Sequence, residues 1–235
     1  MKFRVFLCSA LFSLSAMAEP WTAADSILEN YVTATQLQAV QTRGASMDAD
    51  FDVTLPKLKK HGKLHALRHL SPLGLIRYEK PKFEGDAVVY KEVIARFLNE
   101  EVEAQRQQSA AVAVTPANYN FKYKGTRQDG DRPVHVFEIT PKQKREKLFK
   151  GEVWIDATTY LKVQESGYMV KNPSMMVKKI AFVRRYEIRD GVAVPRKVES
   201  VTDVRLVGKA EMTIDYSNFA VEEDQTRASA DAAWQ

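Results

Sequence analysis

The chain has 235 residues, of which 45% are hydrophobic and 28% charged, a composition typical of a globular domain with a sizeable core. A formal net charge of +5 does not by itself indicate nucleic-acid binding, because lysine-rich strand faces give the same figure. The single cysteine excludes a disulfide framework within the chain.

Residues 1–18 have the three parts of a secretory signal peptide. A positively charged start precedes a short apolar run, and Ala16-Met17-Ala18 forms a small-residue cleavage site. The apolar run is too short to span a membrane, and no stop-transfer segment follows it. We therefore expect export to the periplasm and a mature chain that begins at Glu19 without Cys8. The alternative is a buried N-terminal helix.

The first element of the mature chain is predicted to be an amphipathic helix. Ile27, Leu28, Tyr31 and Val32 recur at helical spacing and form one apolar stripe, and Gly44 is a plausible end. After it, apolar residues alternate with polar ones between positions 46 and 53, which predicts a strand with one buried face.

Three histidines at a spacing of four, His61, His65 and His69, form the one pattern that could bind a metal. On a helix, two neighbours could share a zinc ion. On a strand, neighbours lie roughly 13 Å apart, beyond the reach of one ion. Leucine and alanine alternate with the histidines, and Gly62 disfavours a helix. We therefore predict a strand with solvent-facing histidines and no metal.

Residues 91–108 break the strand pattern with a second amphipathic helix. Its apolar side includes Val93, Ile94 and Phe97, and its polar side carries four glutamates. A helix that lies on a membrane surface is rich in lysine instead. We expect this helix to pack on the sheet.

Strands resume at Tyr119 and continue to Phe219. The last four or five of them form an antiparallel meander with alternating polarity, and Asp190-Gly191 is a strong hairpin signal between two of them. The basic run 142–150 is interpreted as a solvated hairpin tip, with an anionic surface or partner as the alternative. It lacks the aromatic platforms that single-stranded nucleic acid requires.

Together these elements predict an α+β fold in one domain, residues 19–220, followed by a flexible tail at 221–235. A one-sided antiparallel sheet of about eleven strands curls into an unclosed half-barrel because strands twist. The two amphipathic helices are expected to cover its concave face.

Several segments carry a family resemblance: Gly151-Glu152-Val153-Trp154-Ile155-Asp156, Tyr160 to Val163, Gly191 to Pro195, and Ile214 to Asn218. Over residues 24–220 the chain resembles the periplasmic lipoprotein carriers of the LolA and LolB type and the outer-membrane lipoprotein-sorting proteins. The resemblance implies an unclosed barrel, a helical lid and a hydrophobic cavity for acyl chains. Arg43 precedes the first strand and does not match the arginine that latches the lid in that family.

Sequence signatures of enzymes are missing: there is no glycine-rich phosphate loop and no nucleophile elbow. We therefore expect a binding protein without catalytic residues, cofactor or metal. Its expected partners are lipid or lipoprotein acyl chains and an envelope membrane protein as donor or acceptor, not nucleic acid, and we expect a monomer. The residues expected to line the cavity and lid are Ile27, Leu28, Tyr31, Val93, Ile94, Phe97, Trp154, Phe182, Met212 and Ile214.

Each of these positions could instead belong to a closed core, because an apolar stripe looks the same whether it packs on side chains or on ligand. Two other functions stay open. One is an envelope-stress sensor or regulator on the same fold, and the other is a structural or metal-binding periplasmic protein.

Overall fold

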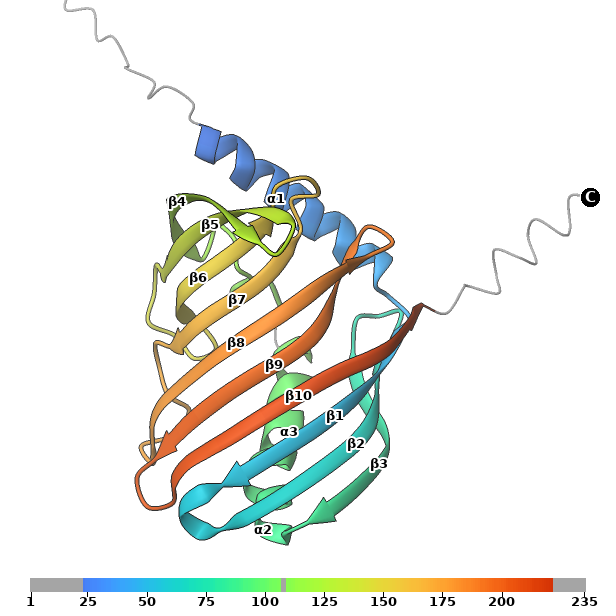
Figure 1. Cartoon of the computed structure of the whole chain (residues 1–235), viewed down its shortest axis with the longest axis vertical. Helices are drawn as coiled ribbons and strands as arrows, with labels where there is room; N and C mark the ends of the chain where they lie inside the picture. The colour runs from blue at the N-terminus through green and yellow to red at the C-terminus, as the bar shows by residue number, and fades with distance from the viewer. Residues whose placement is uncertain (1–22, 107–108, 222–235) are drawn as a thin grey trace, which may run out of the picture.

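The computed structural model describes residues 23–106 and 109–221 of the chain. The predicted signal peptide, the mature start at Glu19 and the tail beyond residue 221 lie outside the described residues. One antiparallel sheet of ten strands forms the body of the molecule (Figure 1). Its strands are β1 (Ala45–Leu55), β2 (Lys60–Leu70), β3 (Ile76–Gly85), β4 (Tyr119–Asp129), β5 (Arg132–Pro141), β6 (Phe149–Asp156), β7 (Lys162–Met169), β8 (Val177–Arg189), β9 (Val192–Val204) and β10 (Gly208–Val221).

The strand order is β3-β2-β1-β10-β9-β8-β7-β6-β5-β4. The first and last strands are therefore neighbours inside the sheet, and the sheet does not close into a barrel. β1 pairs with β10, and β3 and β4 are the two edge strands. Because β3 and β4 are consecutive strands, the segment that joins them has to cross from one edge to the other. That segment contains α2 (Ala87–Val89), a π-helical turn at Tyr90–Ile94 and α3 (Ala95–Arg106), which lie behind the sheet in Figure 1.

The predicted fold class is confirmed, with ten strands rather than about eleven. The Asp190-Gly191 turn has positive φ at both residues, 48° and 76°, as its hairpin geometry requires. The second helix begins earlier than predicted because the Asp86 side chain caps it, accepting from the Val88 amide at 2.8 Å. Leu206 continues the apolar alternation of the preceding strand in the sequence, but it lies in the β9–β10 turn and is 74% exposed.

Two apolar clusters fill the concave face, one beneath each helix. The first, which we call the α3 cluster, joins β1, β2, β9 and β10 to the α2–α3 segment through Phe51, Leu64, Ile94, Met212 and Ile214. The second, the α1 cluster, joins α1 (Ala23–Gln41) to β4–β8 through Ile27, Tyr31, Phe137, Phe149 and Phe182. None of the helices in the described part of the chain has the length and hydrophobicity of a transmembrane helix.

Candidate functional site: the concave face and its two helices

The structure divides the ten predicted site residues among three places. Val93, Ile94, Phe97, Met212 and Ile214 belong to the α3 cluster, and Ile27, Leu28, Tyr31 and Phe182 belong to the α1 cluster. Trp154 lies elsewhere: it packs with Val134, Val136, Val163 and Ile188. Nine of the ten therefore lie on the concave side, but no single group contains them all.

Trp154 lies between Val153 and Ile155 on β6, and the side chains of these two neighbours belong to the α1 cluster. Successive side chains of a strand point to opposite faces, so Trp154 is turned away from that cluster. Its indole N–H donates to Glu152 at 3.0 Å, and the Arg127 guanidinium lies 6.0 Å from its ring centre. Its assignment to the cavity lining has no support in this geometry.

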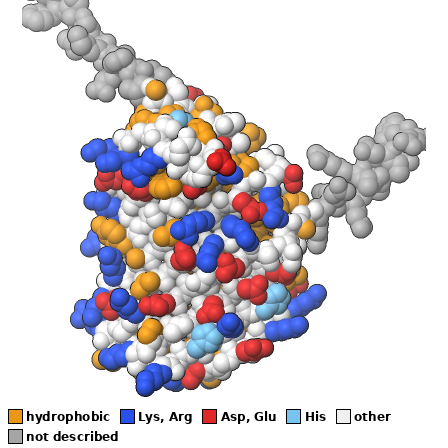
Figure 2. All heavy atoms as spheres, viewed as in Figure 1, with side chains coloured by type: hydrophobic (Ala, Val, Ile, Leu, Met, Phe, Trp, Pro, Cys, Tyr) orange, Lys and Arg blue, Asp and Glu red, His pale blue; other side chains and the backbone are white. Residues whose placement is uncertain are grey.

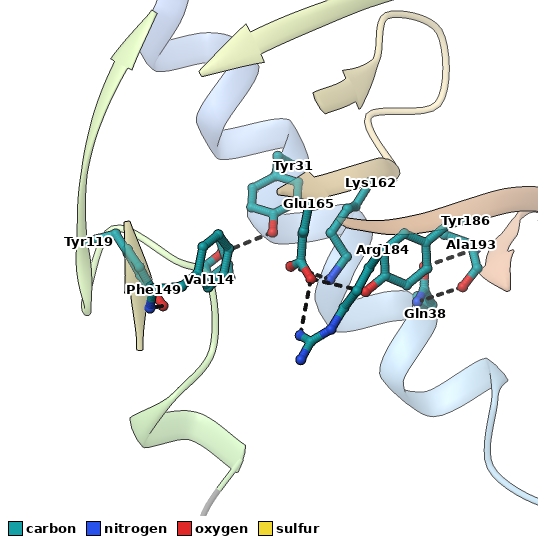
Figure 3. Close-up of polar contacts among 10 residues, drawn as sticks. All are labelled: Tyr31, Gln38, Val114, Tyr119, Phe149, Lys162, Glu165, Arg184, Tyr186 and Ala193. Atoms are coloured by element: carbon teal, nitrogen blue, oxygen red, sulfur yellow. Dashed lines mark hydrogen bonds and ion pairs between the residues drawn. The ribbon is translucent and has the colours of Figure 1, made fainter. Parts of the chain in front are cut away.

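Two polar contacts between neutral groups fix α1 in place. The Tyr31 hydroxyl donates to the Val114 carbonyl at 2.9 Å, and Tyr31 is only 2% exposed. Gln38 satisfies both main-chain groups of Ala193, accepting from its N–H at 3.0 Å and donating to its carbonyl at 3.2 Å. Burial raises the pKa of Tyr31 to about 12, so the phenol stays neutral and keeps its proton for this bond. Figure 3 shows these contacts.

An ion pair holds α3 against β2 and β3. Arg68 on β2 donates from Nη2 at 2.9 Å and from Nε at 3.2 Å to the same carboxylate oxygen of Glu101. The Tyr78 hydroxyl on β3 donates to the other oxygen. The two ion-pair side chains are 11% and 22% exposed. We refer to Arg68, Tyr78 and Glu101 as the α3 latch.

Burial by itself would raise the pKa of the Glu101 carboxyl, but Arg68 and the hydrogen bonds from Tyr78 and Arg68 outweigh it and hold the pKa below 4.5. The same environment raises the pKa of Tyr78, first through burial and then through the Glu101 charge. The latch therefore holds one carboxylate, one guanidinium and one neutral phenol at neutral pH.

Apolar contacts complete the seat of α3. Phe97 meets Phe51 edge to face with ring centres 5.8 Å apart, and Phe51 meets Tyr78 at 6.1 Å. Ile94 is fully buried, whereas Val93, Phe97 and Leu98 are only half-buried. A π-helical turn lies at Tyr90–Ile94, directly before α3. Such turns interrupt the regular helical ladder and occur often at functional sites.

A second charged group lies on β7 and β8, toward the α1 side. Glu165, 2% exposed, accepts from Lys162 at 2.7 Å and from the Tyr186 hydroxyl at 3.0 Å, with Arg184 Nη1 at 3.5 Å (Figure 3). Burial disfavours the charged Glu165, but Lys162 and Arg184 outweigh it and lower its pKa. We refer to Lys162, Glu165, Arg184 and Tyr186 as the central charged group. It carries one excess positive charge.

Sequence reasoning missed the central charged group. A signal for Arg184 exists, because it shares strand parity with Phe182, which is expected to line the cavity. Lys162 and Glu165 have opposite parity and give no such signal. A β-bulge brings them to one side: Trp154 pairs with Gln164 and Ile155 with Lys162, so one residue of β7 is skipped.

The three histidines lie on β2 as predicted. His61 is 2.8 Å from Asp52 and His65 is 2.8 Å from Asp50, both across the β1–β2 pair. Within residues 23–106 and 109–221, no group of three metal-ligating side chains comes together.

Two hollows lie near the clusters, and neither is lined by the ten predicted residues. A cavity of about 10 Å³ lies beside Met47, Val194 and Tyr216, which is space for about one water molecule. An open hollow of about 430 Å³ is lined mostly by charged residues, among them Asp50, His65 and Lys82, together with Phe51 and Leu64. Apart from Trp154, the predicted lining residues pack within the α3 and α1 clusters.

No protein-family model and no curated relative matches the sequence. Solved structures with similar folds include a LolA superfamily protein from Nitrosomonas europaea, at 10% identity over 88% of this chain and 97% of that one, with a TM-score of 0.38. A putative outer membrane lipoprotein-sorting protein domain from Vibrio parahaemolyticus is 12% identical over 88% and 98%, with a TM-score of 0.45. The MucA/MucB complex of Pseudomonas aeruginosa matches at 10% identity over 83% and 100%, with a TM-score of 0.29.

Proposed function

We propose that the protein is an exported periplasmic carrier that holds the acyl chain of a lipid or lipoprotein between α3 and the concave sheet. The observation that supports this proposal is the way α3 packs on the sheet. The helix covers the apolar face of β1, β2 and β10 with half-buried side chains and is tied down by the α3 latch. A helix seated in this way can separate from the sheet as a unit.

Displacing α3 would expose an apolar floor that includes Phe51, Leu64, Met212 and Ile214. Each methylene that an acyl chain removes from water contributes about 0.8 kcal/mol, so one long chain supplies most of a carrier's affinity. Reseating α3 restores the apolar contacts without ligand. That competition keeps binding reversible, which a carrier needs in order to deliver its cargo.

The central charged group suits the polar end of the same ligand. Arg184 keeps 37% of its side chain exposed, although it lies among the buried groups of β7 and β8. The group has two cations for one carboxylate, so a carboxylate or phosphate head group would meet a favourable charge. We include in the proposal that the protein acts by binding and performs no catalysis.

Native mass spectrometry of protein purified from the periplasm tests this function. Lipid that copurifies in stoichiometric amount supports the carrier. A bound protein segment without lipid would favour the envelope-stress sensor, and bound zinc would favour a metal-binding protein. If no lipid copurifies and a fluorescent fatty acid is not taken up, the carrier proposal is wrong.

A further inference from the structure

We propose that one end of the sheet is a docking surface for an anionic phospholipid bilayer. At this end β1, β5, β7 and β9 finish, and their connections lead into β2, β6, β8 and β10. The connections are residues 56–59, 142–148, 170–176 and 205–207, and Asp86 lies at the same end, after β3. We refer to them together as the basic end.

Apolar side chains stand exposed at the tips of these connections. Met175 is 88% exposed and Leu206 is 74% exposed, and Met176 and Leu58 are also exposed. Methionine is unbranched and flexible, and exposed apolar patches of this kind mark membrane or protein interaction sites.

Hydrogen bonds join the separate connections into one surface. Arg205 donates from its main-chain N–H to the Met176 carbonyl at 2.9 Å and from Nε to the Met175 carbonyl at 2.8 Å. Lys57 donates to the Leu206 carbonyl at 3.1 Å. These bonds hold three connections near one another: the one with Leu58, the one with Met175 and Met176, and the one with Leu206.

The basic run that the sequence placed at a hairpin tip extends the same surface. It forms the β5–β6 connection, and Lys171 reaches it from the β7–β8 connection through an ion pair with Glu146 at 2.9 Å. The Val170 amide also donates to the Leu148 carbonyl at 3.0 Å. The run therefore belongs to the surface that carries Met175 and Met176.

The charge of this end is strongly one-sided. The acidic residues of its connections are Asp86 and Glu146, and Glu100 of α3 pairs with Lys147 at 3.7 Å. Its cations are Lys57, Lys59, Lys142, Lys144, Arg145, Lys147, Lys171 and Arg205. In Figure 2, Lys and Arg side chains gather along the left edge of the view, with hydrophobic side chains among them. Cations that surround exposed apolar tips complement a bilayer with anionic head groups, where charge attracts and the tips insert.

The opposite end of the sheet supplies a contrast. Its connections, at residues 42–44, 71–75, 130–131, 157–161 and 190–191, hold one cation, Arg43, against Asp131 and Asp190. It also presents exposed apolar residues, with Leu73 86% exposed. Exposed leucine is thus present at both ends, but cations accompany it at only one of them. A nucleic-acid partner is disfavoured because no aromatic platform accompanies the cations at the tips.

This inference does not depend on the cargo of the concave face, since the test uses the bilayer surface alone. Purified protein is floated with vesicles of phosphatidylethanolamine and phosphatidylglycerol, and separately with vesicles of phosphatidylcholine. We expect binding to the anionic vesicles only, and we expect it to weaken as salt screens the charges. Equal binding to both kinds of vesicle, or binding to neither, would overturn the proposal.

Two variant pairs locate the surface. The double variant Lys144→Gln/Arg145→Gln should lower vesicle affinity by roughly fivefold for each charge removed. Its matched control, Arg43→Gln/Arg77→Gln, removes two exposed cations away from the basic end and should bind as the wild type does. If both pairs lose affinity equally, net charge rather than this surface is responsible.

A fluorescent probe tests insertion of the tips directly. In a Cys8→Ser background, which removes the only cysteine, an environment-sensitive dye is attached to Leu206→Cys or to Leu73→Cys. Anionic vesicles should shift the emission of the dye at position 206 to the blue and leave the dye at position 73 unchanged. A shift at position 73 alone would place the docking surface at the opposite end and refute the inference.

Discussion

α1 and α3 cover the same concave face, but their polar contacts differ in kind. The Tyr31 hydroxyl and the paired bonds of Gln38 hold α1 through neutral groups. α3 is fixed by charge, through Arg68 and Glu101. Hydrogen bonds between neutral groups around a buried aromatic ring change little with pH and salt. The strength of an ion pair beside half-buried side chains depends on both. α1 is therefore packed as part of the core, whereas α3 is the helix that we propose as a lid.

Tyr31→Ala should produce the largest loss of global stability. The change removes a 2% exposed ring from the α1 cluster, and large-to-small core changes of this kind cost about 3–5 kcal/mol. Urea denaturation measures the loss. Tyr31→Phe keeps the ring, loses the hydroxyl and its bond to Val114, and should cost about 1 kcal/mol. If Tyr31→Ala leaves the urea midpoint unchanged, α1 is not part of the core.

Phe97→Asp should open α3 while the sheet stays folded. A carboxylate in place of the ring that packs on Phe51 costs several kcal/mol if it is buried unpaired, so separation of the helix limits that cost. Hydrogen exchange should accelerate in α3 but not in β10, and retention of copurified lipid should fall.

Asn99→Asp is the matched control, because it adds the same carboxylate to an exposed position of the same helix. It should behave as the wild type does. Global unfolding of Phe97→Asp would show that α3 belongs to the core. Unchanged uptake of a fluorescent fatty acid, with the fold intact, would show that the ligand binds elsewhere or that no such site exists.

Arg68→Met should loosen α3 by about 2 kcal/mol, because it leaves the Glu101 carboxylate without its guanidinium partner. The effect is smaller than for a fully buried pair, because 22% of the Glu101 side chain is exposed to solvent. Adding Glu101→Gln to the same chain removes the orphaned charge and should recover part of the loss. Hydrogen exchange of α3 measures both, and an additive double variant would show that the two residues do not interact.

Acid should release α3 before it affects α1. The Glu101 pKa is held below 4.5, so the closed state binds fewer protons than the open state, and its advantage is present above about pH 4.5. That advantage disappears as the pH falls through the lowered pKa. Tyr31, with a pKa of about 12, does not titrate there. Glu165 titrates too, but its ion-pair and hydrogen-bond partners lie on β7 and β8. The Tyr31 phenol of α1 feels its charge without forming an ion pair with it.

Hydrogen exchange at several acid pH values measures this difference. In the variant Glu101→Gln, the protection factors of α3, which are corrected for the intrinsic pH dependence of amide exchange, should no longer change with pH in this range. If α1 and α3 loosen together in the wild type, the distinction between a fixed helix and a conditional one is wrong.

The sequence determined the local elements because their signals lie between near neighbours. Alternation predicted the long strands, Asp190-Gly191 predicted its hairpin, and the spacing around His65 predicted a strand. The apolar stripes predicted two amphipathic helices. Each of these signals depends on the period of one element and needs no knowledge of what lies across from it.

Only the tertiary structure decided which residues meet. The pairing of β1 with β10 makes β3 and β4 the two edges, and this makes the intervening helix cross the concave face. The bulge that turns Lys162 to the side of Glu165 breaks strand parity, so no pattern in the sequence reveals the central charged group. Arg68 shares the parity of Leu64 and Ala66 on the predicted buried face of its strand, and Glu101 belongs to the polar side of the predicted helix. Neither pattern names the partner, and the two become a latch because the fold brings their elements together at 2.9 Å.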